Sequence, residues 1–222
     1  MKLGRLGSSV YKHWSAKDYV QDGLVAMWDG IENAGWGVHD ANTTVWKDLI
    51  GQYDFTLQGA VFNDNSLVST AKGNVATATS HPVIQPYAPK TIEILFKRTG
   101  GDQCIAKFGN WQLWRESSGA YYFYPSTAGS IITNNMAIVD ENRANTFSFA
   151  LTDAQTMDTY CNGVLQSGGK RDYWSTEVWQ FFGRNGNYST GNMYCARYYS
   201  RALTAAEIAA NYRIDKYRFN LP

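Results

Sequence analysis

Short runs of alternating hydrophobic and polar residues follow one another along most of the chain, separated by turn residues. In the run 91–98, the apolar Ile92, Ile94 and Phe96 occupy every second position. A period of two is typical of a β-strand with one buried face. Further strands are predicted at 24–28, 104–108, 111–115, 121–124, 147–151, 157–160, 164–166, 179–182 and 193–199. Many short strands at close spacing indicate an all-β sandwich.

Pairs of turn-forming residues stand between several of these runs, at 100–101, 109–110 and 118–119. Asn162-Gly163 is the two-residue pair with the strongest preference for a tight hairpin turn. The middle of the chain is therefore expected to be a meander of hairpins. By contrast, 29–53 and 183–191 are polar, glycine-containing segments that we interpret as loops.

Two capped helices are expected, one near each end of the chain. Residues 15–18 and residues 204–207 both have the spacing of a capping box, in which the first side chain and the fourth satisfy each other's backbone N–H groups. In the second helix, Ile208 and Tyr212 are spaced by four and would face the sandwich.

A single domain is expected. A length of 222 residues suits one large sandwich whose own core makes it stable. The chain contains no low-complexity linker and no clear internal repeat. We expect residues 1–22 to form an N-terminal arm with a short helix and residues 23–222 to form the sandwich.

Charge and hydropathy argue against two classes of partner. A formal net charge of +1 gives no field that would hold a polyanion, so nucleic acid is not expected to bind. No stretch approaches the roughly 20 apolar residues of a membrane helix, so membrane insertion is not expected either. The N-terminus has early basic residues but no apolar core after them, which does not match a secretory signal.

The three cysteines, Cys104, Cys161 and Cys195, each lie in strand-like sequence. We expect them to be free and buried, as small hydrophobic side chains. One disulfide with one spare thiol is the alternative. The three histidines are isolated in the sequence and show no zinc-ligand spacing.

Several of these segments resemble one family in the right order. Residues 91–96 resemble the central strand of bacterial and phage laminin-G-like domains, which belong to the concanavalin-A-like lectins. Residues 160–165 resemble the strand pair with the Tyr-x-Asn-Gly turn of that family. Residues 182–208, which contain Gly191, resemble its closing strand, its Arg-Ala-Leu-Thr turn and its capped helix.

This resemblance implies two antiparallel sheets in a jelly-roll sandwich with one concave face, a short C-terminal helix and an N-terminal arm. The family often has an aspartate directly after the glycine of the closing strand, where this sequence has Asn192. A role tied to that acid therefore does not carry over to this chain.

Catalysis is not expected. Glycoside hydrolases of this fold need two carboxylates at the scissile bond, and the related enzymes place them in a Glu-x-Asp-x-x-Glu motif on one strand. This chain has no such motif, and the comparable strand carries only Glu93. A glycoside hydrolase is therefore the minor alternative.

Carbohydrate binding is the function that the resemblance implies, and aromatic residues make up 15% of the chain, more than a core needs. Trp111 and Arg115 share one face of a predicted strand while Trp114 lies on the other, so one of the two tryptophans is expected in the core. For each candidate the alternative is ordinary packing or turn geometry. The candidate glycan ligands are Trp36, His39, Asp40, Trp111, Arg115, Arg184, Asn185, Asn187 and Tyr188.

No cofactor is expected to be required, although calcium is the ion that the resemblance implies. Calcium prefers several oxygen ligands. Asp29 with Glu32 and Asn33, or Asp64 with its asparagine neighbours, could supply them. Neither set has diagnostic spacing, and turn or surface roles compete with a metal site.

Two functional hypotheses follow. The first is a non-catalytic carbohydrate-binding or adhesion module that faces the outside of a cell or particle, with a cell-surface polysaccharide as partner. The second is a structural or decoration protein of a phage particle that docks on other chains through residues 1–22. A virion surface would explain an outward-facing fold without a secretory signal, and the two hypotheses are compatible.

Overall fold

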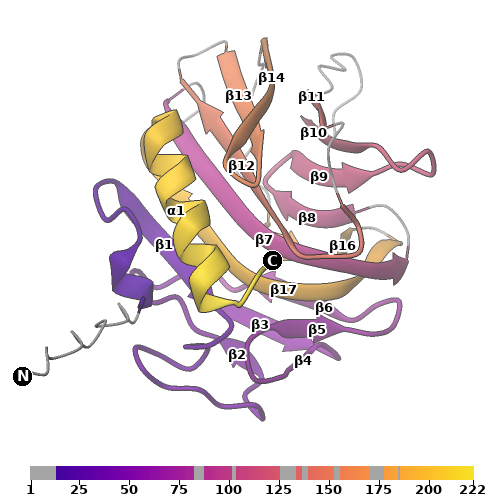
Figure 1. Cartoon of the computed structure of the whole chain (residues 1–222). Helices are drawn as coiled ribbons and strands as arrows, with labels where there is room; N and C mark the ends of the chain where they lie inside the picture. Colours follow the sequence, from indigo (N-terminus) through magenta and orange to yellow (C-terminus); the bar gives the residue numbers. More distant parts are fainter. Residues whose placement is uncertain are drawn as a thin grey trace, which may run out of the picture.

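The computed structural model describes residues 14–82, 88–101, 104–125, 134–136, 140–152, 156–170, 178–184 and 186–222. These residues form two antiparallel sheets and one C-terminal α-helix, α1 (Ala205–Arg218). Figure 1 shows α1 lying across the strands β7, β12 and β17. The predicted two-sheet β-sandwich is confirmed.

The first sheet has its central strands in the order β14-β13-β12-β7-β17-β5-β4, and β1 and β16 also pair with β17. Every pair of these strands is antiparallel. Their bounds are β1 (Leu24–Asp29), β4 (Val61–Phe62), β5 (Leu67–Ser69), β7 (Lys90–Gly101), β12 (Asn145–Leu151), β13 (Thr156–Cys161), β14 (Val164–Lys170), β16 (Gly183–Arg184) and β17 (Asn187–Tyr199).

The second sheet has the order β11-β10-β9-β8-β15-β6-β3-β2. Its strands are also antiparallel. Their bounds are β2 (Val45–Trp46), β3 (Phe55–Gln58), β6 (Val75–Ala78), β8 (Cys104–Phe108), β9 (Trp111–Arg115), β10 (Tyr121–Pro125), β11 (Asn134–Met136) and β15 (Gln180–Phe181).

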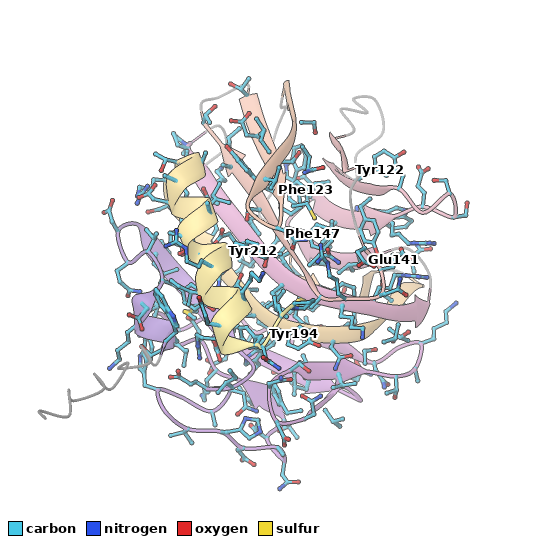
Figure 2. The ribbon with its side chains drawn as sticks, viewed as in Figure 1. Tyr122, Phe123, Glu141, Phe147, Tyr194 and Tyr212 are labelled. Atoms are coloured by element: carbon cyan, nitrogen blue, oxygen red, sulfur yellow. The ribbon has the colours of Figure 1, made fainter. Side chains whose placement is uncertain are left out.

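The core lies between the two sheets and is rich in aromatic rings. Phe123 of β10 stacks on Phe149 of β12, with ring centroids 3.8 Å apart. Tyr121 stacks on Phe147 at 5.4 Å. Figure 2 labels Phe123 and Phe147 in the region between the sheets. Aromatic contacts of this kind add to the free energy of burial and connect the two layers.

The strand β7 is buried on both faces, which differs from the half-buried strand that its alternation predicts. Ile92, Ile94 and Phe96 lie in the core, as expected. Glu93 and Leu95 are also buried, because α1 and the chain segment before β1 cover the outer face of the first sheet. A helix that covers a sheet face shields both apolar and polar side chains from water. Polar residues on that face therefore need hydrogen-bond or charge partners within the protein.

Those partners form a buried charged network under α1. The guanidinium of Arg197 on β17 contacts the carboxylates of Glu93 and Asp215, each at 2.8 Å, and all three side chains are fully buried. The Tyr19 hydroxyl donates to Asp215 at 2.7 Å, and the Asn211 side chain donates to Glu93 at 2.8 Å. The network therefore joins α1, the first sheet and the segment around Tyr19.

The predicted N-terminal arm is described from residue 14 onward, and residues 1–13 lie outside the described part of the chain. The capping box of Ser15 and Asp18 is present and begins a 3₁₀ helix, Ala16–Asp18. The backbone N–H of Val20 donates to the Asn211 side chain of α1 at 3.0 Å. Residues 14–22 thus pack on their own chain.

The predicted turn at Gly100-Gly101 is wrong, because both glycines belong to β7 and pair with β17, whereas the turn predicted at 162–163 is confirmed. Asn162 and Gly163 have φ angles of 53° and 76°, the left-handed conformation of a tight hairpin turn. The three cysteines are free and buried. Among the described residues, no helix is long and apolar enough to span a membrane.

The C-terminal helix begins at the predicted capping box. Thr204 and Glu207 satisfy each other's backbone N–H groups, and Arg201 contacts the Glu207 carboxylate at 2.6 Å. The hydrogen bond from Arg201, opposed by partial burial and helped by those from Thr204, lowers the pKa of Glu207 from 4.5 to about 2. The folded state therefore holds this proton more weakly than the unfolded state does.

We expect the free energy of unfolding to fall as the pH falls from 4.5 towards 2, because Glu207 must take up a proton that the unfolded chain binds more readily. The Glu207→Gln variant lacks this titration and should lose less stability over the same range. Denaturant unfolding of both proteins at several pH values measures the difference. Parallel curves would contradict this role for Glu207.

Candidate functional site

Trp36 is displayed at the tip of a tight turn in the first long loop. Gly35 and Gly37 flank it, with φ angles of 134° and 69° that favour glycine. The residue is 38% exposed, and the ammonium of Lys17 lies 5.2 Å from the ring centroid. Trp36, Lys17 and Glu32 line a shallow hollow on the surface. The predicted loop candidate is therefore accessible.

His39 and Asp40 follow on the same loop, and both are exposed. A ring nitrogen of His39 lies 3.2 Å from the carbonyl oxygen of Ile31. The side-chain amide of Asn33 donates a hydrogen bond to the backbone carbonyl of Asp40 and accepts one from the backbone N–H of Asp40. These two hydrogen bonds close the loop. Asp40 also accepts a hydrogen bond from the backbone of Asn42. These contacts hold the shape of the loop.

Asp29 and Asn33, two of the residues proposed for calcium, have other partners. Arg218 contacts one oxygen of Asp29 at 2.6 Å, and the backbone N–H groups of Ile31 and Glu32 donate to the other. Asn33 is buried, with its amide used by Asp40 as described above. Asp64 is exposed in a separate turn. Among the described residues, no group of three or more histidine, cysteine, aspartate or glutamate side chains could hold a metal ion.

Trp111 is wrong as a surface candidate, because it is fully buried and belongs to the core between the sheets. Arg115, on the same face of β9, is occupied by an acidic partner. Its guanidinium contacts both oxygens of Glu141, at 2.6 and 3.2 Å. The Tyr121 hydroxyl donates to the same carboxylate at 2.9 Å. Glu141 precedes β12, so this cluster joins the two sheets near one edge.

The predicted loop 183–191 is instead mostly strand. Gly183–Arg184 and Asn187–Tyr199 pair as the hairpin of β16 and β17. Tyr188 is half-buried with its ring over Gly183, where a Cβ atom would overlap it. Asn187 is also half-buried in β17. The side chain of Arg184 and the whole of Asn185 lie outside the described residues.

The candidates therefore do not converge on one site. The Trp36 loop leaves β1 beside Tyr194, where the Gly30 N–H donates to the Tyr194 carbonyl. Tyr188 lies six residues earlier on β17, which is roughly 20 Å away along an extended strand. No single ligand of a few sugar units would contact both.

The outer face of the second sheet brings together aromatic side chains that the predicted candidates did not include. Because Trp111 and Leu113 point into the core, Trp114 points to the opposite face of β9. On β10, Tyr121 and Phe123 point inward and Tyr122 points outward, as Figure 2 shows for Tyr122 and Phe123.

Trp114 and Tyr122 are directly opposite each other in the β9–β10 ladder. Side chains in such positions have Cβ atoms roughly 5 Å apart, so the two rings are neighbours. Both residues are half-buried. They form an aromatic pair on the side of the sandwich away from α1.

A row of polar side chains crosses the same face beside this pair. The ladder registers align Thr56 with Thr77, Thr77 with Gln180, and Gln180 with Lys107. The next partner of Lys107 is Gln112 on β9, but Gln112 is buried and does not extend the row that a ligand could reach. The amide of Gln180 donates to the Thr77 hydroxyl at 3.3 Å. Hydroxyl, amide and ammonium groups thus lie on the face that carries the aromatic pair.

Alternation in the sequence contained the signal for this face. It placed Trp111 and Trp114 on opposite faces of one strand, and the same period of two in the predicted strand 121–124 puts Tyr121 and Tyr122 on different faces. It did not show which face of the strand points into the core, because tryptophan occurs both in cores and at surfaces. That choice depends on the register between strands.

Comparison with known proteins supports the fold. No protein-family model and no curated protein sequence matches the chain. The structure is similar to Trypanosoma rangeli sialidase in complex with sialic acid, with a TM-score of 0.64 and 14% identity over 86% of this chain and 32% of the sialidase. This chain therefore spans about a third of the length of the sialidase.

Two further similar structures are domains of larger proteins. The binding domain of Paraclostridial Mosquitocidal Protein 1 has a TM-score of 0.67 and 13% identity over 86% of this chain and 52% of that one. Domain 4 of a GH43 extracellular arabinanase from Geobacillus stearothermophilus, in complex with arabinotriose, has a TM-score of 0.63 and 14% identity over 84% of this chain and 96% of that domain. At these identities the likeness shows a common sandwich fold.

Proposed function

We propose that this chain is a carbohydrate-binding module that acts without catalysis, and that the outer face of the second sheet holds the sugar. The observation that carries the proposal is the cross-strand pair of Trp114 and Tyr122, on the same sheet face as the row of Thr56, Thr77, Gln180 and Lys107. Aromatic rings offer an apolar surface to the C–H face of a sugar ring, and the polar row offers hydrogen bonds to its hydroxyls.

The comparisons support this class of ligand. The similar arabinanase domain was solved with arabinotriose and the similar sialidase with sialic acid. The laminin-G-like motifs of the sequence favour the same interpretation. We further propose that the module faces the outside of a cell or particle. Attachment to a virion is an additional hypothesis, and it depends on residues 1–13, since residues 14–22 pack on this chain.

The proposal that this protein is not an enzyme rests on the position of Glu93 in the first sheet. Glu93, the acid on the strand comparable to the catalytic strand of related hydrolases, is buried with Arg197 and Asn211 under α1. Burial raises the pKa of Glu93, and the charge of Arg197 opposes that rise. A carboxylate enclosed in this way has no access to a glycosidic bond.

A glycan array with the full chain, followed by titration of the best oligosaccharide, tests the proposal. We expect Trp114→Ala and Tyr122→Ala each to weaken binding by about tenfold or more, as loss of a central aromatic contact does. Binding should persist with a calcium chelator, and the oligosaccharide should be recovered uncleaved.

Trp36→Ala is the matched control, because it removes an exposed tryptophan from a different surface. Its affinity should equal that of the unmodified protein. The sheet face would be excluded if Trp36→Ala abolished binding while the two sheet variants retained it. A blank array would contradict carbohydrate binding, and cleaved product would contradict the absence of catalysis.

A further inference from the structure

A second surface hollow lies at the C-terminal end of α1, on the opposite side of the sandwich from the aromatic pair. It has a volume of about 420 Å³, within the roughly 300–1,000 Å³ typical of ligand sites. Its walls come from the last turns of the helix and the residues that follow: Arg213, Lys216, Tyr217, Asn220 and Leu221.

Two cations of this hollow are available to a ligand. Among the described residues, no carboxylate forms an ion pair with Arg213 or Lys216, whereas the neighbouring Arg218 is paired with Asp29 at 2.6 Å and Glu32 at 3.1 Å. Arg213 is exposed and Lys216 is half-buried. The hollow therefore carries two positive charges that no described side-chain carboxylate neutralises by an ion pair.

The end of a helix also carries a negative partial charge, which would repel an anion. That partial charge is equivalent to roughly half an elementary charge and is felt only within the last turn. Two full cations outweigh it. The backbone N–H groups of Phe219 and Leu221 moreover satisfy carbonyls of the last turn, at 3.0 and 2.9 Å. The net field in the hollow thus favours a negatively charged group.

An aromatic platform adjoins the cations. Tyr217 is 66% exposed, and Trp14 stacks on one side of its ring at a centroid distance of 5.9 Å and an interplanar angle of 14°. The stacking fixes the orientation of the tyrosine while most of its surface stays exposed. Leu221 extends the apolar part of the wall.

We propose that this hollow binds an acidic saccharide, with a sugar ring against Tyr217 and its carboxylate or sulfate group between Arg213 and Lys216. A neutral sugar would leave both cations unused, and a small inorganic anion would leave the aromatic platform unused. Arginine and lysine form their strongest hydrogen bonds with such anionic groups. This site goes beyond the proposed function, because it lies on a different surface and recognises charge.

The test is a titration of the full chain with three defined oligosaccharides of equal length: one sulfated, one with uronate carboxylates and one neutral. We expect at least one acidic ligand to bind at low salt, with an affinity that falls as the salt is raised from about 50 to about 500 mM, because screening shortens the reach of surface charges. The two acidic ligands distinguish sulfate from carboxylate recognition.

The Arg213→Ala/Lys216→Ala double variant should lose about tenfold or more in affinity for the acidic ligand and most of the salt dependence. Tyr217→Ala should weaken the acidic saccharide but leave the weak binding of inorganic sulfate unchanged. Lys47→Ala removes an exposed lysine elsewhere and should have no effect. All these positions are at the surface, so the variants should fold.

Trp114→Ala separates this site from the sheet face, and it should leave the acidic ligand bound at the helix with unchanged affinity. The proposal would be overturned if neither acidic ligand bound, if the neutral ligand bound equally well, or if the double variant bound as tightly as the unmodified protein. A loss in Trp114→Ala alone would instead place the acidic saccharide on the sheet.

Discussion

Arg197→Met should cost this protein about 3–5 kcal/mol of unfolding free energy, the usual result of removing one member of a buried charged group. Arg197 is fully buried and contacts Glu93 and Asp215, which are also fully buried. Methionine fills a similar volume but leaves the two carboxylates without a cation. Denaturant unfolding followed by intrinsic tryptophan fluorescence measures the loss.

The pH dependence identifies the cause of that loss. Burial already raises the pKa of Glu93, and Arg197 is the cation that opposes the rise. Without it the pKa in the folded state rises further above the unfolded value of 4.5. A raised carboxyl pKa stabilises the fold at low pH and loses that effect as the pH increases. The deficit of the variant should therefore be smallest near pH 4.5 and grow towards neutral pH.

Arg143→Met is the control, since Arg143 contacts Asp140 at 3.6 Å with both side chains substantially exposed. Ion pairs of this kind contribute about 1 kcal/mol or less. Equal losses in the two variants, or a deficit in Arg197→Met that does not change with pH, would show that the charged network does not hold α1 on the sheet.

The parts of this fold that the sequence predicts are those set by neighbouring residues. The capping boxes at Ser15 and Thr204 and the turn at Asn162-Gly163 depend on backbone groups within four residues. The strands β8 (Cys104–Phe108) and β9 (Trp111–Arg115) match their predicted bounds, and the turn at Gly109-Asn110 separates them. Local chemistry is sufficient for such features.

The buried network could not be predicted in the same way. More than a hundred residues separate Glu93 from Arg197 in the sequence. These two residues meet Asp215 only when α1 docks on the first sheet. In the sequence each looks like a solvated surface charge. The helix pattern also pointed to Ile208 and Tyr212 as the buried face, whereas Asn211 and Asp215 are fully buried with Ile208.

The candidate site also has features that the local sequence predicts and features that depend on the pairing of strands. Alternation correctly separated Trp111 from Trp114, but the pairing of β9 with β8 and β10 decides which of them meets the core. The Gly183–Gly191 segment looked like a loop because it is rich in glycine and asparagine. In the structure, Asn187 to Gly191 belong to β17, and Gly183-Arg184 form the strand β16 that pairs with it.

Gly191→Ala should strongly destabilise the closing strand β17. Gly191 lies in the middle of β17, next to a register shift against β7. A Cβ atom there would overlap the backbone carbonyl oxygen of Lys97 and would lie 2.7 Å from the ring of Phe96. Because the carbonyl belongs to a paired central strand, it cannot move without disturbing the ladder. We expect a loss of about 1–3 kcal/mol or more, as overpacking of a core does.

Gly73→Ala separates steric overlap from backbone strain. Gly73 has a φ of 92°, which disfavours alanine, but no atom lies within 4 Å of the position that an added Cβ atom would take. It should therefore lose only the cost of the backbone conformation, and less than Gly191→Ala. If the two variants unfold at the same denaturant concentration, the close approach of β7 and β17 is not what requires glycine. A larger loss at Gly191 would explain in physical terms why the closing-strand motif contains this glycine.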